Sequence, residues 1–273
     1  MTYWNNIYSN FNPVAFDLGF ISIHWYGIMY ALALLTALMA GKWIAKRDKL
    51  PITNKLLDNY FIWVEIGVIV GARVGYILFY DTHTAYYLTH PWQMFNPFMN
   101  GIFVGIRGMS YHGAIIGFLL ATFAFKYRHK KTDIWGLLDL VALSVPVGYI
   151  FGRIGNFMNQ ELIGRPTELS WGVYIDGALR HPSQLYEAFL EGVVVFFILY
   201  IYRTKKRFSG ELIALYGVLY SLARFIAEFW REPDFQMGYM YGGWMTMGQA
   251  LSLLMILVSI ILYVYLNMRV KKK

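Results

Sequence analysis

The sequence predicts an all-α integral membrane protein with seven transmembrane helices. Of its 273 residues 58% are hydrophobic and only 15% are charged, and the hydrophobic residues form long continuous runs. A helix needs about 20 apolar residues to cross a bilayer, whereas a transmembrane β-barrel would show alternating segments of about ten. Seven runs are long enough for helices, at about 20–41, 58–80, 104–125, 134–156, 184–202, 210–230 and 244–267.

The first run is predicted to be a retained helix. Residues 1–19 contain no Lys or Arg, and the run that follows is too long for the apolar core of a signal peptide. The sequence has no internal repeat, low-complexity tract or soluble domain, so residues 1–273 predict one membrane-embedded domain. Residues 171–176 (Trp-Gly-Val-Tyr-Ile-Asp), which lie between two of the runs, predict a short strand in a small exterior head.

Clustered positive charge predicts the orientation of the helices. Seventeen of the 24 Lys and Arg residues fall into four groups that occupy alternate connections between the runs. The groups are Lys42, Lys46, Arg47, Lys49 and Lys55; Lys126, Arg128, Lys130 and Lys131; Arg203, Lys205, Lys206 and Arg207; and Arg269, Lys271, Lys272 and Lys273. By the positive-inside rule these connections are cytoplasmic, which predicts an exterior N-terminus and a cytoplasmic C-terminus. The net charge of +8 therefore indicates membrane topology and not nucleic-acid binding.

The remaining seven basic residues are all arginines, and three of them lie inside apolar runs. The seven are Arg73, Arg107, Arg153, Arg165, Arg180, Arg224 and Arg231. With this orientation, Arg73, Arg153 and Arg224 lie in the outer third of their helices. A charge at the bilayer centre costs roughly 2.5–3.5 kcal/mol, so such residues are candidates for function. The alternatives are an Arg–Glu pair between helices and a side chain that extends to lipid headgroups.

The sixth run places polar groups along one helical face. Tyr220, Arg224, Glu228 and Arg231 are spaced by four, four and three residues. The fifth run carries a similar stripe, formed by Gln184, Glu187 and Glu191. Two interpretations remain open: the two helices bury their charges against each other, or the arginines bind an anionic headgroup, because Arg matches phosphate with a planar fork.

The fourth run ends in an unusually polar block, Gly152 to Arg165. Its last thirteen residues include six polar side chains, and Arg153 and Asn156 share a helical face. Gly152 and Gly155 permit close packing of helices, but packing alone does not require the polar groups. The polar groups of the chain thus converge on the outer side of the membrane and predict a site for an anionic lipid.

His112 is a candidate base because imidazole exchanges protons near neutral pH; the alternative is a histidine that only forms hydrogen bonds. His24 is the other histidine of the apolar runs. Ser110 lies two residues from His112 and would point to another helical face, and no G-x-S-x-G motif occurs, which disfavours a serine hydrolase. The six scattered histidines and the absence of cysteine predict that no metal is bound and that any reacting thiol comes from a substrate.

Several motifs, in this order, resemble the prolipoprotein diacylglyceryl transferase family over nearly the whole chain. They are His24-Trp25-Tyr26-Gly27; Gly71 to Tyr76; Gly108-Met109-Ser110-Tyr111-His112-Gly113; Gly152 to Arg165; His181 to Glu187; and Arg224 through Glu228 to Arg231-Glu232-Pro233-Asp234. The block from Gly152 to Arg165 is the most specific. Two departures are the single glycines, Gly108 and Gly113, on either side of the Met-Ser-Tyr-His stretch, where family members often have two, and the short exterior stretch 157–183.

The resemblance implies transfer of the diacylglyceryl group of phosphatidylglycerol to the lipobox cysteine of a prolipoprotein signal peptide. The products are a thioether and glycerol 1-phosphate, in the first step of bacterial lipoprotein maturation. The implied location is the bacterial cytoplasmic (inner) membrane, with the active site facing the outer leaflet among membrane lipids. No cofactor and no nucleic-acid partner is expected.

This reaction suggests a role for each candidate residue. Arg153 and Arg224 are expected to hold the leaving phosphate, because fixed cations lower the barrier to its departure. His112 is the expected base for the thiol, assisted by Tyr26. The remaining candidates for substrate binding are Asn156, Glu161, Gly164, Tyr220, Glu228, Arg231 and His24.

Three other functions compete with this interpretation. A transporter of anionic lipids would also place arginines in a membrane groove, but transporters tend to have midplane sites in repeated halves. An intramembrane protease lacks its nucleophile motif here. A scaffold without catalytic function does not require the polar block at the end of the fourth run.

Overall fold

The computed structural model describes most of the chain. The described residues are 2–19, 22–99, 102, 103, 105, 108–233, 239, 240 and 243–271. Arg107, Asp234, Lys272 and Lys273, which figure in the sequence interpretation, lie outside them. The chain forms two compact units, one comprising Met1–Leu50 with Trp135–Lys273 and the other Pro51–Ile134.

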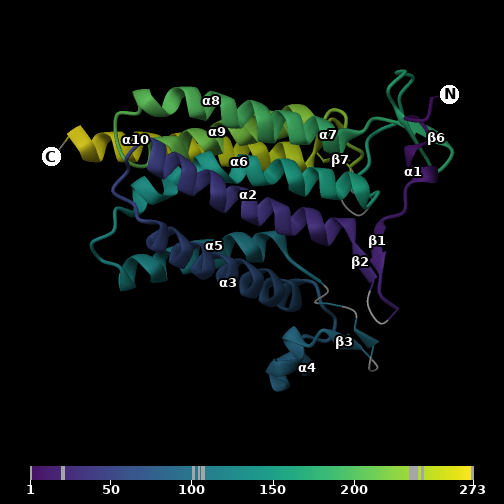
Figure 1. The fold of residues 1–273 in the computed structure, drawn as a ribbon, viewed down its shortest axis with the longest axis horizontal. Coiled ribbons are helices and arrows are strands. Elements are labelled where there is room, and N and C mark those ends of the chain that lie inside the picture. The colour runs from purple at the N-terminus through teal and green to yellow at the C-terminus, as the bar shows by residue number, and fades with distance from the viewer. Residues whose placement is uncertain are drawn as a thin grey trace. The chain divides into compact units, whose positions relative to one another are not determined.

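The first unit is built on helices that run side by side (Figure 1). Its helical elements are α1 (Ile7–Asn10), α2 (Trp25–Arg47), α6 (Ile134–Met158), α7 (Ser183–Glu187), the π-helix η2 (Ala188–Val194), α8 (Val195–Tyr202), the 3₁₀ helix η3 (Arg203–Lys205), α9 (Glu211–Ala227) and α10 (Met247–Lys271). Its strands form three antiparallel pairs: β1 (Val14–Asp17) with β2 (Ser22–His24), β5 (Val173–Ile175) with β6 (Ala178–Arg180), and β7 (Tyr239–Met240) with β8 (Met245–Thr246).

The second unit is a pair of helices with a small appendage. It contains α3 (Asn54–Phe79), α4 (Thr84–Thr89), the 3₁₀ helix η1 (Pro91–Phe95), the paired strands β3 (Phe98–Met99) and β4 (Ile102–Phe103), and α5 (Tyr111–Arg128). Glycines let α3 and α5 approach closely: a Cβ on Gly117 would lie 2.0 Å from the carbonyl oxygen of Gly67. An apolar cavity of about 500 Å³ lies beside this contact, lined by Trp63, Val70 and Leu120 among others.

Within the described residues, five helical segments are long and apolar enough to cross a membrane, so the membrane character of the chain is confirmed. They are Trp25–Arg47, Asn54–Phe79, Ile134–Met158, Ser183–Lys205 and Met247–Lys271. Each corresponds to a predicted run. The other two predicted runs contain α5, with 18 residues, and α9, with 17, which are not among the five.

Two predicted helix starts were wrong. The first run was expected to be helical from residue 20, but residues 22–24 form β2 and α2 begins at Trp25. The third run was expected to be helical from residue 104, but α5 begins only after Ser110, whose hydroxyl caps the helix by accepting from Gly113 N at 3.2 Å. Before it, Gly108 has φ +73°, a conformation that does not continue a right-handed helix.

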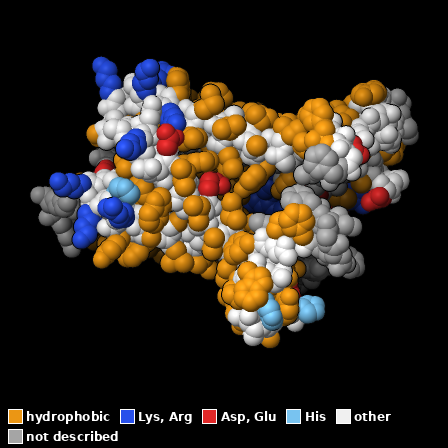
Figure 2. Space-filling view, turned by 60° about the horizontal axis from the view of Figure 1, so that its bottom comes forward, with side chains coloured by type: hydrophobic (Ala, Val, Ile, Leu, Met, Phe, Trp, Pro, Cys, Tyr) orange, Lys and Arg blue, Asp and Glu red, His pale blue; other side chains and the backbone are white. Residues whose placement is uncertain are grey.

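The described residues of three of the four basic clusters, except Lys55, belong to the first unit and share one end of it. Lys46 and Arg47 lie in the last turn of α2, and Arg269 and Lys271 in the last turn of α10. Arg203, in η3, joins the end of α2 through Asp48, with Nε donating to Oδ2 at 2.9 Å. In Figure 2, hydrophobic side chains cover much of the visible face and many Lys and Arg side chains gather toward one edge.

The opposite end of the first unit carries its small strands and α1 (Figure 1). The strand predicted at residues 171–176 is present as β5, which pairs with β6. Asn5 fastens the N-terminal segment to this hairpin by donating to the carbonyl oxygens of Ser170 and Gly172 at 2.9 and 2.8 Å. Tyr8, Phe157 and Val173 are buried together beneath it.

Candidate functional site

The site begins at the end of α6, where a chain of hydrogen bonds extends from Arg153. Its Nη1 donates to Oδ1 of Asn156 at 3.2 Å, and Nδ2 of Asn156 donates to Oε1 of Glu161 at 2.6 Å. Asn159 also donates to Glu161, at 3.0 Å. Glu161 is therefore fixed by two amides, and Asn156 links its carboxylate to the guanidinium group.

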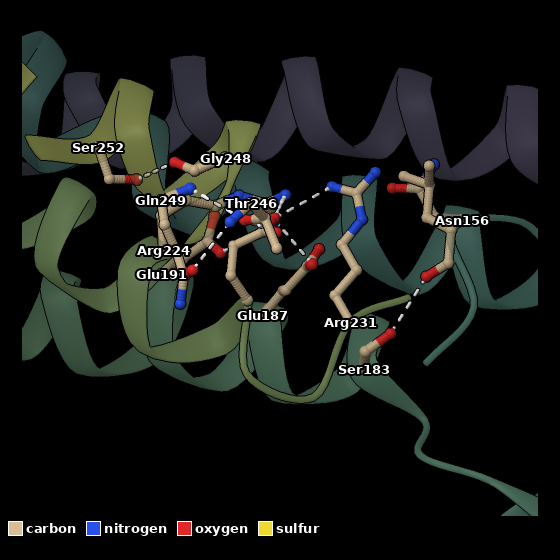
Figure 3. A network of polar contacts seen from close by, with 12 residues as sticks. Asn156, Ser183, Glu187, Glu191, Arg224, Arg231, Thr246, Gly248, Gln249 and Ser252 are labelled. Atoms are coloured by element: carbon tan, nitrogen blue, oxygen red, sulfur yellow. Dashed lines mark hydrogen bonds and ion pairs between the residues drawn. The ribbon is translucent and has the colours of Figure 1, made fainter. Parts of the chain in front are cut away.

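Two fully buried carboxylates face the arginines. Glu187, at the end of α7, contacts Nη1 of Arg224 through Oε1 at 2.7 Å and Nε of Arg153 through Oε2 at 2.9 Å. Glu191, one turn later in the π-helix η2, lies 3.6 Å from Nη1 of Arg224 and accepts a hydrogen bond from Tyr149. Figure 3 shows these acidic side chains and Arg224 projecting toward one another. Arg–Glu pairing between helices, one of the two interpretations left open by the sequence, is thus present.

A third carboxylate completes the network. Glu228 pairs with Arg224 one turn before it, and its Oε1 lies 3.7 Å from Nη1 of Arg231. The hydroxyl of Thr246 donates to Oε2 of Glu228 at 2.8 Å. A Cβ on Gly248 would lie 2.5 Å from the Glu228 carboxyl carbon, so the glycine leaves room for this carboxylate at the start of α10.

Backbone contacts set the position of Arg231 and Gly164. These two residues form an isolated antiparallel bridge, and Glu232 N donates to the carbonyl of Ile163 at 3.1 Å. A Cβ on Gly164 would lie 2.2 Å from the carbonyl oxygen of His181 and 2.9 Å from that of Trp230. Gly164 therefore permits three backbone segments to meet.

Arg165 and Arg180 bind the backbone segments that meet at Gly164. Arg165 donates to the carbonyl oxygens of Arg231 and Glu228 at 2.8 and 3.1 Å. Arg180 donates to the carbonyl of Gly164 at 3.1 Å and pairs with Glu232 at 3.2 Å. Both arginines hold the segments that carry the network.

Nearby aromatic residues belong to the same unit. Tyr149 accepts from Nε of Arg153 at 2.7 Å, and its ring meets that of Tyr220 edge-on at 5.7 Å. Tyr26 packs beside α6, since a Cβ on Gly155 would lie 3.5 Å from Cδ2 of Tyr26. His24 is exposed and immediately precedes α2.

His112 and Arg73 lie in the second unit, apart in the chain from the arginine network. His112 is exposed in the first turn of α5, next to the ring of Tyr111. Arg73 is buried and donates to the carbonyl oxygens of Met94 and Gly108 at 2.5 and 3.3 Å, which ties α3 to the segments that follow it. The assignment of His112 as the base stays a prediction.

One histidine outside the membrane-spanning segments has a shifted pKa. Burial lowers the pKa of His181 from its usual value, because the charged ring loses solvation. Its Nδ1 lies 3.3 Å from the hydroxyl of Tyr186, at the frame around Gly164. Among the described residues, no group of three or more His, Asp and Glu side chains is arranged to hold a metal ion.

Sequence reasoning missed two contributors to the network, Tyr149 and Thr246, and it considered Glu187 and Glu191 only as charges buried between two helices. Glu187 and Glu191 carried a signal, since two carboxylates four residues apart in an apolar run match the spacing of Arg224 and Glu228. Tyr149 precedes Arg153 by one turn. Thr246 carried no signal, because its contact with Glu228 spans eighteen residues and depends on the tertiary fold.

This fold and site define a helical membrane protein that buries a network of arginines and carboxylates at one end of a helix bundle. A family model described as prolipoprotein diacylglyceryl transferase matches residues 13–265, and the chain belongs to this family.

Relatives match along nearly their whole length. The chain is 63% identical over 267 residues to the phosphatidylglycerol–prolipoprotein diacylglyceryl transferase of Campylobacter lari, with 98% of each chain covered. It is 63% identical over 270 residues to the protein of that name from Wolinella succinogenes, covering 99% of this chain and 98% of the other. The corresponding protein of Aliarcobacter butzleri is 58% identical over 264 residues, with 97% of each covered.

Proposed function

We propose that the chain transfers the diacylglyceryl group of phosphatidylglycerol to the lipobox cysteine of prolipoproteins, the first step of lipoprotein maturation. The observation that carries this proposal is the pair of arginines, Arg153 and Arg224, fixed in a buried polar network in a member of this family. A new bond joins the cysteine sulfur to the glyceryl carbon, and the bond from that carbon to the phosphate oxygen breaks. The thiol proton passes to a base, and glycerol 1-phosphate leaves.

Arg153 is the better placed of the two arginines to receive the phosphate. Its Nε and Nη1 are engaged by Tyr149, Glu187 and Asn156, but no contact within the described residues uses its Nη2. Both terminal nitrogens of Arg224 already contact carboxylates. Arg153 thus retains a donor for a phosphate oxygen, while Arg224 contributes mainly its charge.

Other residues complete the proposed site. Asn156, Glu161, Glu228 and Arg231 orient the arginines or the headgroup glycerol, with Gly164, Tyr220 and His24 at its margins. His112 is the proposed base and Tyr26 its hydrogen-bonding assistant. No cofactor or metal takes part in this proposal.

We further infer seven membrane crossings in one membrane domain, residues 1–273, with the N-terminus outside. At about 1.5 Å per residue, the 18 residues of α5 and the 17 of α9 extend about 27 and 26 Å, close to the roughly 30 Å of a hydrocarbon core. The basic end of the first unit then faces the cytoplasm, and the arginine network faces the outer leaflet of the bacterial inner membrane. Phosphatidylglycerol and the prolipoprotein signal peptide would both reach it there.

A two-product assay tests the function. Purified full-length protein is incubated with phosphatidylglycerol vesicles and a lipobox peptide, and a Cys→Ser peptide serves as the control. We expect the peptide mass to rise by one diacylglyceryl unit, with one glycerol phosphate released per modified peptide and none from the Ser peptide. Movement of lipid between leaflets without either product would instead indicate a transporter and contradict the proposal.

A further inference from the structure

We propose that Glu187 is a positioning residue for the transfer reaction: its one carboxylate bridges Arg153 and Arg224 and sets their spacing around the leaving phosphate. This inference rests on the proposed function. The two oxygens of Glu187 lie 2.7 Å from Nη1 of Arg224 and 2.9 Å from Nε of Arg153, and the side chain is fully buried. Since α6 carries Arg153 and α9 carries Arg224, a residue of a third element holds the two guanidinium groups together.

The start of α7, the helix that carries Glu187, is attached to the segment that follows α6. At the start of α7, Ser183 donates to the carbonyl of Leu162 at 3.1 Å and Gln184 to that of Glu161 at 2.5 Å. These bonds attach α7 to the polar block that follows Arg153. Glu187 therefore moves with the same block as the arginine it contacts.

The π-helix that follows aligns a second carboxylate with the first. Residues 188–194 adopt the wider π conformation. This conformation is rare in proteins, and where it occurs it is often at a functional site. Gly192 brings this segment against α6, because a Cβ there would lie 2.5 Å from Cγ1 of Ile150 and 3.2 Å from the carbonyl of Pro146. Glu191 consequently approaches Arg224 as well, at 3.6 Å. Glu191 pairs only with that arginine, and Glu228 pairs with Arg224 and Arg231, so Glu187 alone bridges Arg153 and Arg224 among the described ion pairs.

The bridge has a chemical consequence. Two guanidinium groups repel each other in a buried site, and a carboxylate between them offsets this repulsion. The leaving phosphate carries one negative charge as a diester and gains a second as the carbon–oxygen bond breaks. Cations already fixed in place stabilise that added charge without reorganising, so their spacing affects turnover more than lipid binding.

Matched variants test the bridge. Glu187→Gln removes the charge, and Glu187→Asp keeps it but is one methylene too short to reach both arginines. Glu211→Gln is the control, because Glu211 is also fully buried and paired, with Arg207 at 3.0 Å, at the opposite end of α9. We expect Glu187→Gln to lower kcat about 100-fold and Glu187→Asp about tenfold, with KM for phosphatidylglycerol nearly unchanged. Each rate is normalised to the amount of folded protein. We expect Glu211→Gln to retain the wild-type rate.

A double-mutant cycle separates positioning from folding. If Glu187 acts through the arginines, Glu187→Gln combined with Arg153→Lys loses little more activity than the worse single variant. Losses that multiply, a near-wild-type Glu187→Gln, or failure of both Glu187 variants to fold would each overturn the inference. A wild-type protein that releases no glycerol phosphate would instead refute the proposed function, so the two failures are distinguishable.

Discussion

The two ends of the first unit both bury carboxylates, but they use them differently. At the basic end, Asp139 accepts from Lys206 Nζ at 3.1 Å and from the backbone N of Gly210 and Ile213 at 2.9 and 3.1 Å. Glu211 likewise accepts from the side chains of Tyr202 and Arg207 at 2.8 and 3.0 Å. These carboxylates combine backbone N–H donors with side-chain donors and fasten a turn between helices.

At the other end, the donors to the carboxylates of Glu187, Glu191 and Glu228 within the described residues are all side chains. Glu187 contacts Arg224 across 37 residues, and Tyr149 contacts Glu191 across 42. Three buried oxygens, Oε1 of Gln184, Oε2 of Glu187 and Oε1 of Glu191, lack a hydrogen bond within the described part of the chain. Buried polar atoms are nearly always satisfied, so such a group calls for a functional explanation. We propose from this comparison that the basic end has a structural role and that the arginine network takes part in the reaction.

The largest expected effect is from Arg153→Lys. Lysine keeps the charge but loses the planar fork, so we expect the transfer rate to fall about 100-fold while the protein still folds. Arg203→Lys is the matched control, because Arg203 is also partly buried and paired with a carboxylate, Asp48, at the basic end. Equal losses in both variants, measured as peptide modification per folded protein, would break the comparison.

Gly164→Ala tests the backbone frame. The added methyl group would overlap the carbonyl oxygen of His181, so the segments must separate, at a cost of about 1–3 kcal/mol in folding free energy. The thermal midpoint of the purified protein reports this loss. Gly152→Ala is the control, because nothing lies within 4 Å of its added Cβ. Similar midpoints for the two variants would show that the close approach at Gly164 does not constrain the fold.

Thr246→Val is expected to have a smaller effect. It removes the hydroxyl that donates to Glu228 at 2.8 Å while keeping the shape, and a hydrogen bond to a charged group contributes about 1.5–3 kcal/mol. We expect partial loss of transfer activity, with Ser252→Ala, whose hydroxyl donates only to the carbonyl of Gly248, close to wild type. Activity assays on both variants would reveal whether Glu228 needs this support.

The smallest effect concerns pH. Burial lowers the folded-state pKa of His181, so the unfolded chain binds a proton more readily than the folded one. The contribution of His181 to the free energy of unfolding is therefore fully present above about pH 6.5 and is lost gradually as the pH falls below that value. Thermal midpoints between pH 5 and 8 should depend less on pH in His181→Gln than in wild type. The exposed His83 provides the control, and an unchanged slope in His181→Gln would contradict this account.

Hydrophobic runs were sufficient to predict the long helices apart from two of their starts, because such runs depend on local composition. The sequence did not predict the capped start of α5 at Ser110 or the π-helix around Glu191, since these depend on hydrogen bonds and on packing against other helices. The arginines of the site were found because a charge in an apolar run is conspicuous. Their partners were missed or considered only as structural pairs, and Arg73 proved to bind backbone carbonyls.

We propose that phosphatidylglycerol reacts at the arginine network and not at the basic end. Photo-crosslinking of the full-length protein with a phosphatidylglycerol analogue that carries a photoreactive headgroup tests this most directly. We expect crosslinks in residues 149–165 and 220–231, suppressed by excess unlabelled phosphatidylglycerol. Competed crosslinks confined to residues 42–50 and 203–211 would contradict it.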